Sequence, residues 1–291
     1  MRRKSERVVL PLVFIVMSQN TIQIRKHYNV FAIYAVTLMI PFVWAFISSL
    51  KTDDEYYERV FAWPRDWLFG NYIRAFKEFT VNGVSFLGMF ANSLWLTVAG
   101  TFISIMVTSM TAYTVAKYDF RGNKFIYRLA IFIMVIPIVG NLPAQYKLIM
   151  DLGINNPIGI LLLYTGGFGM NFIILHGTYR SISWTYAEAA FIDGGSDWTV
   201  YWRIMLPQAM PSLIALSVLS CIGIWNDYMT PFLYLKNSPT LALGIYQFDV
   251  MQQYRSNVPI YYCGVLLSML PILILFVCMQ KTIMTNTVAG G

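Results

Sequence analysis

The chain has 291 residues, of which 57% are hydrophobic and only 12% are charged. A soluble domain carries about 25% charged residues, so the composition argues against a soluble protein and indicates a single polytopic membrane domain. The net charge of +7 does not indicate nucleic-acid binding, because the basic residues are not gathered into one patch with stacking aromatic residues.

Residues 1–27 combine a basic start with a short apolar run, like the first two regions of a signal peptide. No cleavage site of small residues follows, and the run is too short to cross a membrane. We therefore expect a cytoplasmic or interfacial segment that leads into the first span. A translation start further downstream is the alternative.

Six apolar segments follow, each long enough for the helix of about 20 residues that a bilayer requires. They predict an all-α fold with six transmembrane helices in one domain over residues 28–291. The predicted spans are residues 28–50, 86–116, 129–150, 158–179, 208–235 and 261–280.

The distribution of Lys and Arg predicts the orientation of these spans. An even number of spans puts both termini on the same side of the membrane. That side, which includes the loops 117–128 and 180–207, holds thirteen of the 21 Lys and Arg residues. Because basic residues concentrate in cytoplasmic loops, we expect both termini in the cytoplasm.

A polar segment at residues 188–207 separates the fourth and fifth predicted spans. The residues before its glycines have the composition of a short helix, with Ser183 as the expected N-cap. Gly194 and Gly195 would end this helix, because glycine tolerates the left-handed backbone of a C-cap. The segment therefore predicts a short helix followed by a glycine elbow.

A second short helix is expected after the elbow. Ser196 and Asp197 can cap it, and its aromatic residues at 198, 201 and 202 have the spacing of one helical face. Pro207 is expected where the fifth span begins. These residues alone leave two interpretations open, an interfacial connector in the lipid headgroup region and a docking element for a cytoplasmic partner.

The polar segment resembles the Glu-Ala-Ala loop of importer permeases in the ATP-binding cassette (ABC) superfamily. The residues that match the family pattern are Glu188, Ala189, Ala190, Asp193, Gly194, Leu206 and Pro207. Gly195 stands where alanine is usual, Tyr201 stands where phenylalanine is common, and "SIS" at 181–183 replaces Ser-Ile-Pro.

Weaker similarities extend the resemblance along the chain. They lie at residues 71–72, 92–93 and 225–235 and point to the carbohydrate-uptake branch, in particular to its maltose-permease type. The final "AGG" is similar to the start of that branch's Gly-Ala-Val-Lys-Gly ending, which predicts that a few residues follow.

The resemblance implies a permease subunit of an ATP-driven importer for a sugar or oligosaccharide, in a bacterial cytoplasmic membrane. In that family the loop is a coupling helix that sits in a groove of the ATPase. The residues to which this role carries over are Glu188, Ala189, Ala190, Phe191, Ile192, Asp193, Gly194 and Gly195. The implied partners are a second homologous permease, two ATPase subunits and an external solute-binding protein. An importer for a non-sugar solute and a membrane-embedded glycan or lipid enzyme are the alternatives.

Catalytic and cofactor motifs are missing from the sequence. The chain has no Gly-Lys pair and hence no phosphate-binding P-loop. It also has no HExxH, Gly-x-Ser-x-Gly or zinc-finger spacing. We therefore expect no enzyme activity and no metal or cofactor on this chain, with ATP and Mg²⁺ bound by the partner ATPase.

Polar and aromatic residues within the predicted spans suggest a substrate path, because a sugar stacks on rings and needs hydrogen-bonding groups. The candidates are Trp225, Asn226, Asp227, Tyr228, Asn141 and Asn171. Asp227 is the only acidic residue inside the predicted spans, unless the fifth span is shorter than predicted. The glycines at 166–169 could also break the fourth span. An aromatic cap at the membrane interface is the alternative for residues 225–228.

The predicted outer loop at residues 236–260 is long for a simple connection. We expect it to contact the external binding protein, with Tyr246, Phe248 and Tyr254 as candidate contact residues. The alternative is that this loop packs on the permease's own outer surface.

Overall fold

The computed structural model describes residues 30–135, 140–252 and 257–288, and the regular structure of these residues is helical apart from one short two-stranded hairpin. The helical architecture predicted from the sequence is therefore confirmed. Residues 1–27 and Tyr254 lie outside the described residues, so their predicted roles stay predictions.

Four helices among the described residues are long and apolar enough to cross a membrane. Only 6% to 33% of the residues in their apolar stretches are buried in the isolated chain, as is expected for helices that contact lipid or other subunits. These helices are Val30–Ser49, Phe86–Lys117, Asp197–Trp225 and Val258–Gln280.

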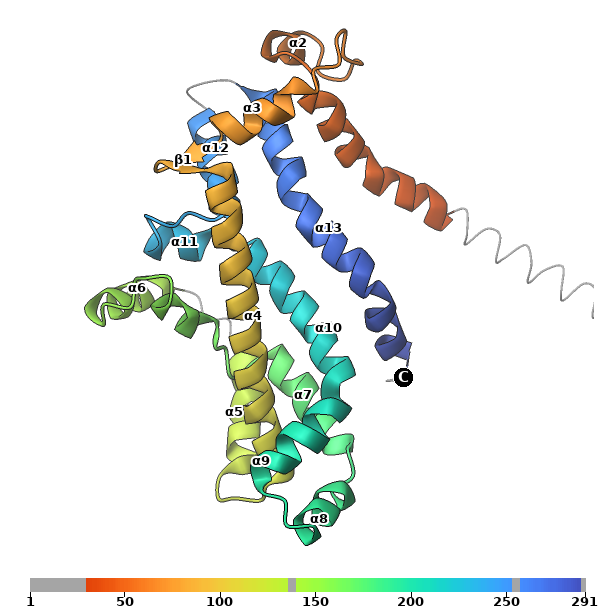
Figure 1. Ribbon diagram of the computed structural model, residues 1–291, viewed down its shortest axis with the longest axis vertical. Helices are drawn as coiled ribbons and strands as arrows, with labels where there is room; N and C mark the ends of the chain where they lie inside the picture. Colours follow the sequence, from red (N-terminus) through yellow and green to blue (C-terminus); the bar gives the residue numbers. More distant parts are fainter. Residues whose placement is uncertain (1–29, 136–139, 253–256, 289–291) are drawn as a thin grey trace, which may run out of the picture.

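The long helix α4 (Phe86–Lys117) is the axis of the fold (Figure 1). α7 (Met170–Ser181) and α10 (Leu206–Trp225) pack against it, and α13 (Val258–Val288) packs against α10. The helix Val30–Ser49 diverges from this group in Figure 1, so its apolar side chains are exposed.

The largest cluster of buried side chains lies where α4, α7 and α10 meet. Phe172, Leu175 and Tyr179 of α7 are completely buried there, and Met205 lies with them at the start of α10. Burial of such side chains stabilises the fold by about 1.5–3 kcal/mol each. This cluster therefore forms a rigid base beside the polar segment.

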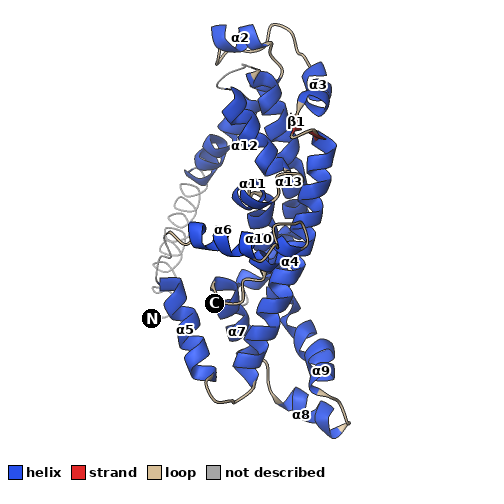
Figure 2. Cartoon of the chain, turned by 90° about the vertical axis from the view of Figure 1, so that its left-hand side faces the viewer, coloured by secondary structure: helices blue, strands red, loops and turns tan. Residues whose placement is uncertain are grey.

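The two ends of α4 carry different elements, as both views show (Figures 1 and 2). One end, called the α8 end, holds α8 (Thr185–Ile192) and α9 (Asp197–Val200). The opposite end, called the α2 end, holds α2 (Asp53–Glu58) and α3 (Gly70–Glu78). The polar segment and residues 51–85, which link the first two predicted spans, thus lie at opposite ends of the molecule.

A two-stranded hairpin leads into α4 at the α2 end. β1 (Thr80–Val81) pairs antiparallel with β2 (Val84–Ser85). Asn82 and Gly83 form the turn with positive φ angles of 52° and 79°, as an Asn-Gly hairpin requires. α12 (Leu241–Gln252) packs nearby against α4 and α13, so much of the predicted loop 236–260 is a helix.

The third predicted span, residues 129–150, is not one continuous helix. It falls in α5 (Asn123–Val135) and α6 (Leu142–Asp151), and both views show α6 lying across the direction of α4 (Figures 1 and 2). Gly140 has a φ of 88° just before α6, and Pro143 lies in its first turn. A left-handed glycine and an N-terminal proline both favour the start of a new helix.

The fourth predicted span, residues 158–179, is also divided. A 3₁₀ helix, η1 (Gly159–Tyr164), is separated from α7 by the glycine-rich residues 166–169. Gly166 and Gly167 have φ angles of 60° and 51°. The expectation that these glycines could break the span is confirmed.

The fifth predicted span is displaced along the chain. The helix is continuous from α9 through a π-helical turn, η2 (Tyr201–Met205), into α10, which ends at Trp225. Pro207 therefore lies within a helix and does not mark its beginning. A proline cannot donate to the carbonyl four residues back, and the wider π turn just before it lets the helix continue. α11 (Met229–Tyr234) follows as a separate short helix.

Candidate functional site

The turn after α8 is a Schellman motif formed by two glycines. Gly195 N–H donates to the Ala190 carbonyl at 2.7 Å, and Gly194 N–H donates to the Phe191 carbonyl at 3.0 Å. Gly194 has a φ of 81°. A Cβ on Gly195 would lie only 2.8 Å from the Ala190 carbonyl oxygen. The backbone geometry thus explains why both positions are glycine, and the predicted elbow is confirmed.

α8 presents charged and apolar side chains to the surroundings. Glu188 is exposed, and its carboxylate forms no ion pair or hydrogen bond among the described residues. Ile192 is 86% exposed and Phe191 is 37% exposed. Ala187 is completely buried, and Ala190 packs partly against the chain's own core. The outward surface of α8 therefore includes residues 188, 189, 191 and 192.

The start of α9 is held to the end of α4. Tyr118, the residue that caps α4, donates from its hydroxyl to Oδ1 of Asp197 at 2.6 Å. The Ser196 hydroxyl accepts from Thr199 N–H at 3.3 Å, so Ser196 is the N-cap of α9 as predicted. Burial, together with the hydrogen bond to Asp197, raises the pKa of Tyr118, so the phenol stays protonated.

A buried hydroxyl cluster holds the helix after α9 to the bundle. The Ser109 hydroxyl of α4 lies 2.6 Å from the Tyr179 hydroxyl and 2.8 Å from the Tyr201 hydroxyl. Tyr113 packs its ring against both tyrosines. A fully partnered buried polar cluster fixes relative positions, because breaking it leaves hydroxyls unpaired.

Two details of the sequence-based prediction are wrong in this segment. The N-cap of α8 is Trp184 rather than Ser183, although the Ser183 hydroxyl accepts from Thr185 N–H at 3.3 Å. Tyr201 is buried, while Trp198 and Trp202 stack on each other outside the core. Consecutive residues of a helix point about 100° apart, so Tyr201 can face the core while Trp202 faces the surroundings.

The predicted substrate-path residues do not form one cluster. Trp225 is buried and donates from Nε1 to the Ser268 carbonyl at 3.1 Å, and so it joins α10 to α13. The Asn226 amide donates to the Ile222 carbonyl of its own helix. Both residues border a cavity of about 270 Å³, whereas Tyr228 stacks on Tyr246 with ring centroids 4.5 Å apart.

Asp227 lies beyond the end of the fifth helix and has protein partners. Its Oδ2 accepts from the Tyr164 hydroxyl at 2.9 Å, and its Oδ1 accepts from Thr230 N–H at 3.0 Å. The fifth span is shorter than predicted, so Asp227 is not an acidic residue in the middle of a membrane helix. These contacts join η1 to the start of α11.

The two asparagines of the predicted path lie in different places. Asn171 donates to the Ser220 hydroxyl at 3.1 Å and borders a cavity of about 220 Å³ together with Ser104 and Thr108 of α4. Asn141 is exposed at the start of α6 and does not border this cavity.

The two described residues that were predicted to contact a binding protein lie in different surroundings. Tyr246 is 38% exposed. Phe248 packs within the chain, where it stacks on Phe79 with centroids 4.4 Å apart. For Phe248 the structure favours the alternative that the segment packs on the permease itself.

Sequence reasoning missed an exposed aromatic group at the α2 end. Its members come from α2 and the segment that links α2 to α3, where Trp63 and Trp67 stack. The other exposed side chains of the group are Tyr57, Phe61 and Phe69. The density of aromatic residues over residues 56–69 was the available signal.

A protein-family comparison assigns the membrane domain. The model of the family "Binding-protein-dependent transport system inner membrane component" matches residues 100–283, which include α8, its glycine elbow and α10. This match covers more than half of the chain. The chain belongs to this family.

Curated relatives of this permease cover most of both chains. A probable ABC transporter permease protein, YurM, of Bacillus subtilis (strain 168) is 28% identical, covering 89% of this chain and 85% of YurM. The melibiose/raffinose/stachyose import permease protein MelC of the same strain is 27% identical, covering 89% and 93%. The diacetylchitobiose uptake system permease protein NgcG of Streptomyces coelicolor (strain ATCC BAA-471 / A3(2) / M145) is 24% identical, covering 89% and 85%.

A solved structure confirms the permease fold. It is a bacterial ABC transporter involved in the import of the acidic polysaccharide alginate. One of its chains matches with a TM-score of 0.73 and 25% identity, over 88% of this chain and 94% of that chain. The permease is thus a multi-pass membrane component of a transport system that works with a binding protein and an ATPase, and it is not an enzyme.

Proposed function

We propose that this permease moves a sugar or oligosaccharide inward, using ATP hydrolysed by a separate subunit. The strongest support for the substrate class is that relatives at similar identity along most of the chain are named for sugars. The cavities that Trp225, Asn226 and Asn171 border suit a substrate with apolar faces and many hydroxyls, because aromatic rings and amides line them. The solute itself is selected largely by the binding protein.

α8 is proposed to be the element that docks on the ATPase. The observation that carries this assignment is the unpaired, exposed Glu188 beside the exposed Phe191 and Ile192, on a helix fixed by two glycines. An apolar anchor with an adjacent charge is the composition of a protein contact. Asp193, Gly194 and Gly195 shape the turn, while Ala189 leaves room for close approach.

The orientation follows from the same assignment. An ATPase is cytoplasmic, so the α8 end faces the cytoplasm and the α2 end faces outward. The excess of Lys and Arg on the α8 side agrees with this orientation. Both termini are then cytoplasmic, and Tyr246 with the exposed aromatic group of α2 and α3 faces the binding protein.

The complete transporter is proposed to contain a second, homologous permease and two ATPase subunits, which bind ATP and Mg²⁺. The helix Val30–Ser49 offers an apolar surface that is almost uncovered in the single chain. A gated path between two permeases would use the cavity that Asn171 borders.

The docking role is tested by reversing the charge of α8. Glu188→Lys is expected to weaken ATPase co-purification and abolish sugar uptake while the permease level in the membrane stays normal. A charge-assisted contact contributes about 1.5–3 kcal/mol, and repulsion adds to its loss. Asp151→Lys is the matched control, since Asp151 is an exposed acidic residue on α6, away from α8. Normal uptake by Glu188→Lys would refute the docking role.

A further inference from the structure

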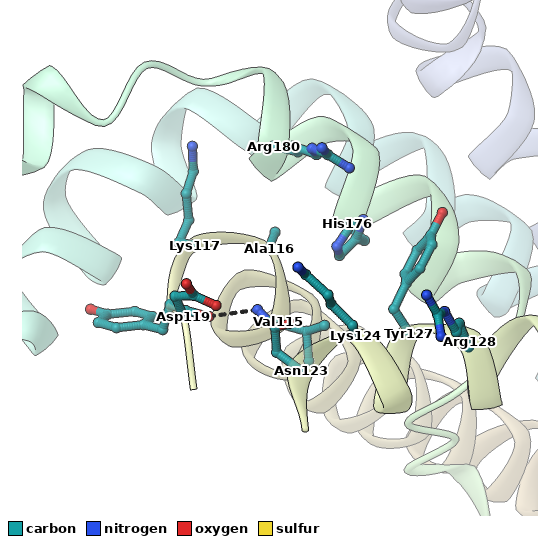
Figure 3. Close-up of a pocket in the computed structure, with 11 residues that line it drawn as sticks. Val115, Ala116, Lys117, Asp119, Asn123, Lys124, Tyr127, Arg128, His176 and Arg180 are labelled. Carbon is teal, nitrogen blue, oxygen red and sulfur yellow. Dashed lines mark hydrogen bonds between the residues drawn. The ribbon is translucent and has the colours of Figure 1, made fainter. Parts of the chain in front are cut away.

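A basic cavity of about 350 Å³ lies at the α8 end, between the end of α4, the start of α5 and α7. Lys117, Lys124, Arg128 and Arg180 border it, and Asp119 is the only acidic residue among its lining residues. Figure 3 shows Lys124 of α5 reaching toward His176 of α7, with Arg128 and Arg180 around the same space. Three separate elements therefore direct positive charge into one cavity.

The positive charges of this cavity are largely without protein partners. The Lys117 ammonium donates to the Ile182 carbonyl. Lys124, Arg128 and Arg180 form neither an ion pair nor a side-chain hydrogen bond within the part of the chain that the structure describes. Neighbouring like charges repel one another, so an anion in this cavity would be stabilised by all of them.

The inner wall of the cavity is an ordered aromatic pair. The Tyr127 ring of α5 stacks on the His176 ring of α7, with centroids 4.4 Å apart. His176 is only 7% exposed, so this wall is part of the packed interior. The stack fixes α5 beside α7 and thereby sets the distance between the cations that the two helices carry.

An exposed apolar face lies along α5, next to the face that borders the cavity. Phe125, Leu129 and Phe132 follow one another at spacings of four and three residues, which puts them on one face of the helix. All three side chains are exposed, and the sequence predicts that this helix enters the membrane. A ligand with a phosphate head and hydrocarbon chains would match both the basic cavity and this face.

We propose that the cavity binds the phosphate headgroup of an anionic membrane lipid, whose acyl chains lie along α5. Basic pockets between helices at a membrane surface are suited to such headgroups, and arginine pairs with phosphate through two parallel hydrogen bonds. The lipid would join α5 to α4 and α7 beside the segment that leads into α8. Inorganic phosphate shares the headgroup chemistry but has no chains to place on the apolar face.

The test measures retention of lipid by the purified, fully assembled transporter. The complex is reconstituted into bilayers of phosphatidylcholine and phosphatidylglycerol at 7:3, extracted in mild detergent, and its bound lipids are counted by native mass spectrometry. Arg128→Gln, Arg180→Gln and Lys124→Gln are each expected to lower the affinity for phosphatidylglycerol about fivefold. Arg121→Gln removes an exposed charge from the turn between α4 and α5, outside the cavity. This variant should retain lipid like the unaltered protein.

Further variants and a competition measurement distinguish lipid from other ligands and from a folding defect. Arg128→Lys and Arg180→Lys keep the charge and should retain most of the lipid, which a folding defect would not allow. Millimolar inorganic phosphate should not displace phosphatidylglycerol, and displacement by it would overturn the lipid assignment. Equal lipid retention in the cavity variants and in Arg121→Gln would also overturn it. If the cavity variants kept their lipid but lost ATPase co-purification, the cavity would instead be a protein contact, and the proposal would be wrong.

Discussion

The hydroxyl of Tyr118 donates a 2.6 Å hydrogen bond to Oδ1 of Asp197, and this bond joins the end of α4 to the first residue of α9. The two residues are far apart in the sequence, yet both lie at the α8 end. α8 is connected to α9 through a stiff glycine elbow. A displacement of α8 by a bound partner would therefore reach α4 through this contact as well as through the continuous fifth helix.

Removing the Tyr118 hydroxyl is expected to loosen this connection. In Tyr118→Phe the ring can stay packed against Trp184 and Tyr113, but the bond to Asp197 and the longer 3.3 Å contact with the Tyr113 hydroxyl are lost. Because Asp197 is exposed, we expect a cost of only about 1 kcal/mol. The measurable result is less sugar transported per ATP hydrolysed in proteoliposomes. Tyr146→Phe is the control, since Tyr146 is exposed on α6 and its hydroxyl forms no hydrogen bond within the described residues. Equal losses in both variants would contradict the proposed connection.

The hydrogen bond between Tyr118 and Asp197 predicts how the stability of the folded state changes with pH. Burial first, and then the hydrogen bond to Asp197, hold the pKa of Tyr118 above its usual value of about 10. The folded state therefore binds the phenolic proton more tightly than the unfolded state, so this stabilisation is fully present below pH 10. It is lost as the pH rises from 10 toward the folded pKa. The ratio of transport between the unaltered protein and Tyr118→Phe should stay constant from pH 6 to 9, and a drift within that range would contradict this.

Gly194 should tolerate substitution less well than an ordinary helical glycine. Its φ of 81° is one that L-residues rarely adopt, although nothing lies within 4 Å of the position of an added Cβ. Gly194→Ala should cost about 1–2 kcal/mol from the backbone alone, and the β-branched Gly194→Val more. We expect normal permease levels with reduced uptake. Gly177→Ala in α7, which also has open space but no positive φ, should be neutral or slightly stabilising. Uptake by Gly194→Val at the control level would show that the elbow is not needed.

Local features of the fold could be predicted from sequence because they depend on nearby residues. Gly194 and Gly195 end α8, Ser196 caps α9, and the glycines at 166–169 break the fourth span. In each case a residue's own backbone preference or a neighbouring side chain decides the structure. The long apolar helices were also predictable, because about 20 consecutive apolar residues have few other solutions.

Features that depend on distant residues could not be predicted in this way. Apolar composition did not reveal the break between α5 and α6, and the proline rule placed the start of the fifth span at Pro207 because a π turn is invisible in sequence. The sequence predicts Phe248 as a surface contact, but its stacking on Phe79 depends on tertiary packing. The partners of Asp227 and the basic cavity likewise arise only when separate segments meet.

The hydroxyl cluster around Ser109 should matter for stability. Ser109→Ala leaves the hydroxyls of Tyr179 and Tyr201 without their shared partner, at a cost of about 1–3 kcal/mol for buried polar groups. Thermal unfolding of the detergent-solubilised complex should shift to lower temperature. Ser181→Ala, at an exposed position, should change the stability by no more than about 0.5 kcal/mol. Equal melting temperatures for the two variants would show that the cluster contributes nothing.

Asp227 should act as a structural residue rather than as a substrate ligand. Both of its oxygens are occupied, by the Tyr164 hydroxyl at 2.9 Å and by Thr230 N–H at 3.0 Å. Asp227→Asn and Tyr164→Phe should each lower the melting temperature, and the double variant should lose less than the sum, because both changes remove one interaction. Asp151→Asn, at an exposed position on α6, is the control. The apparent affinity for sugar uptake should be unchanged in all of these variants. A weaker apparent affinity in Asp227→Asn, with normal affinity in Tyr164→Phe, would instead assign this carboxylate to the substrate path.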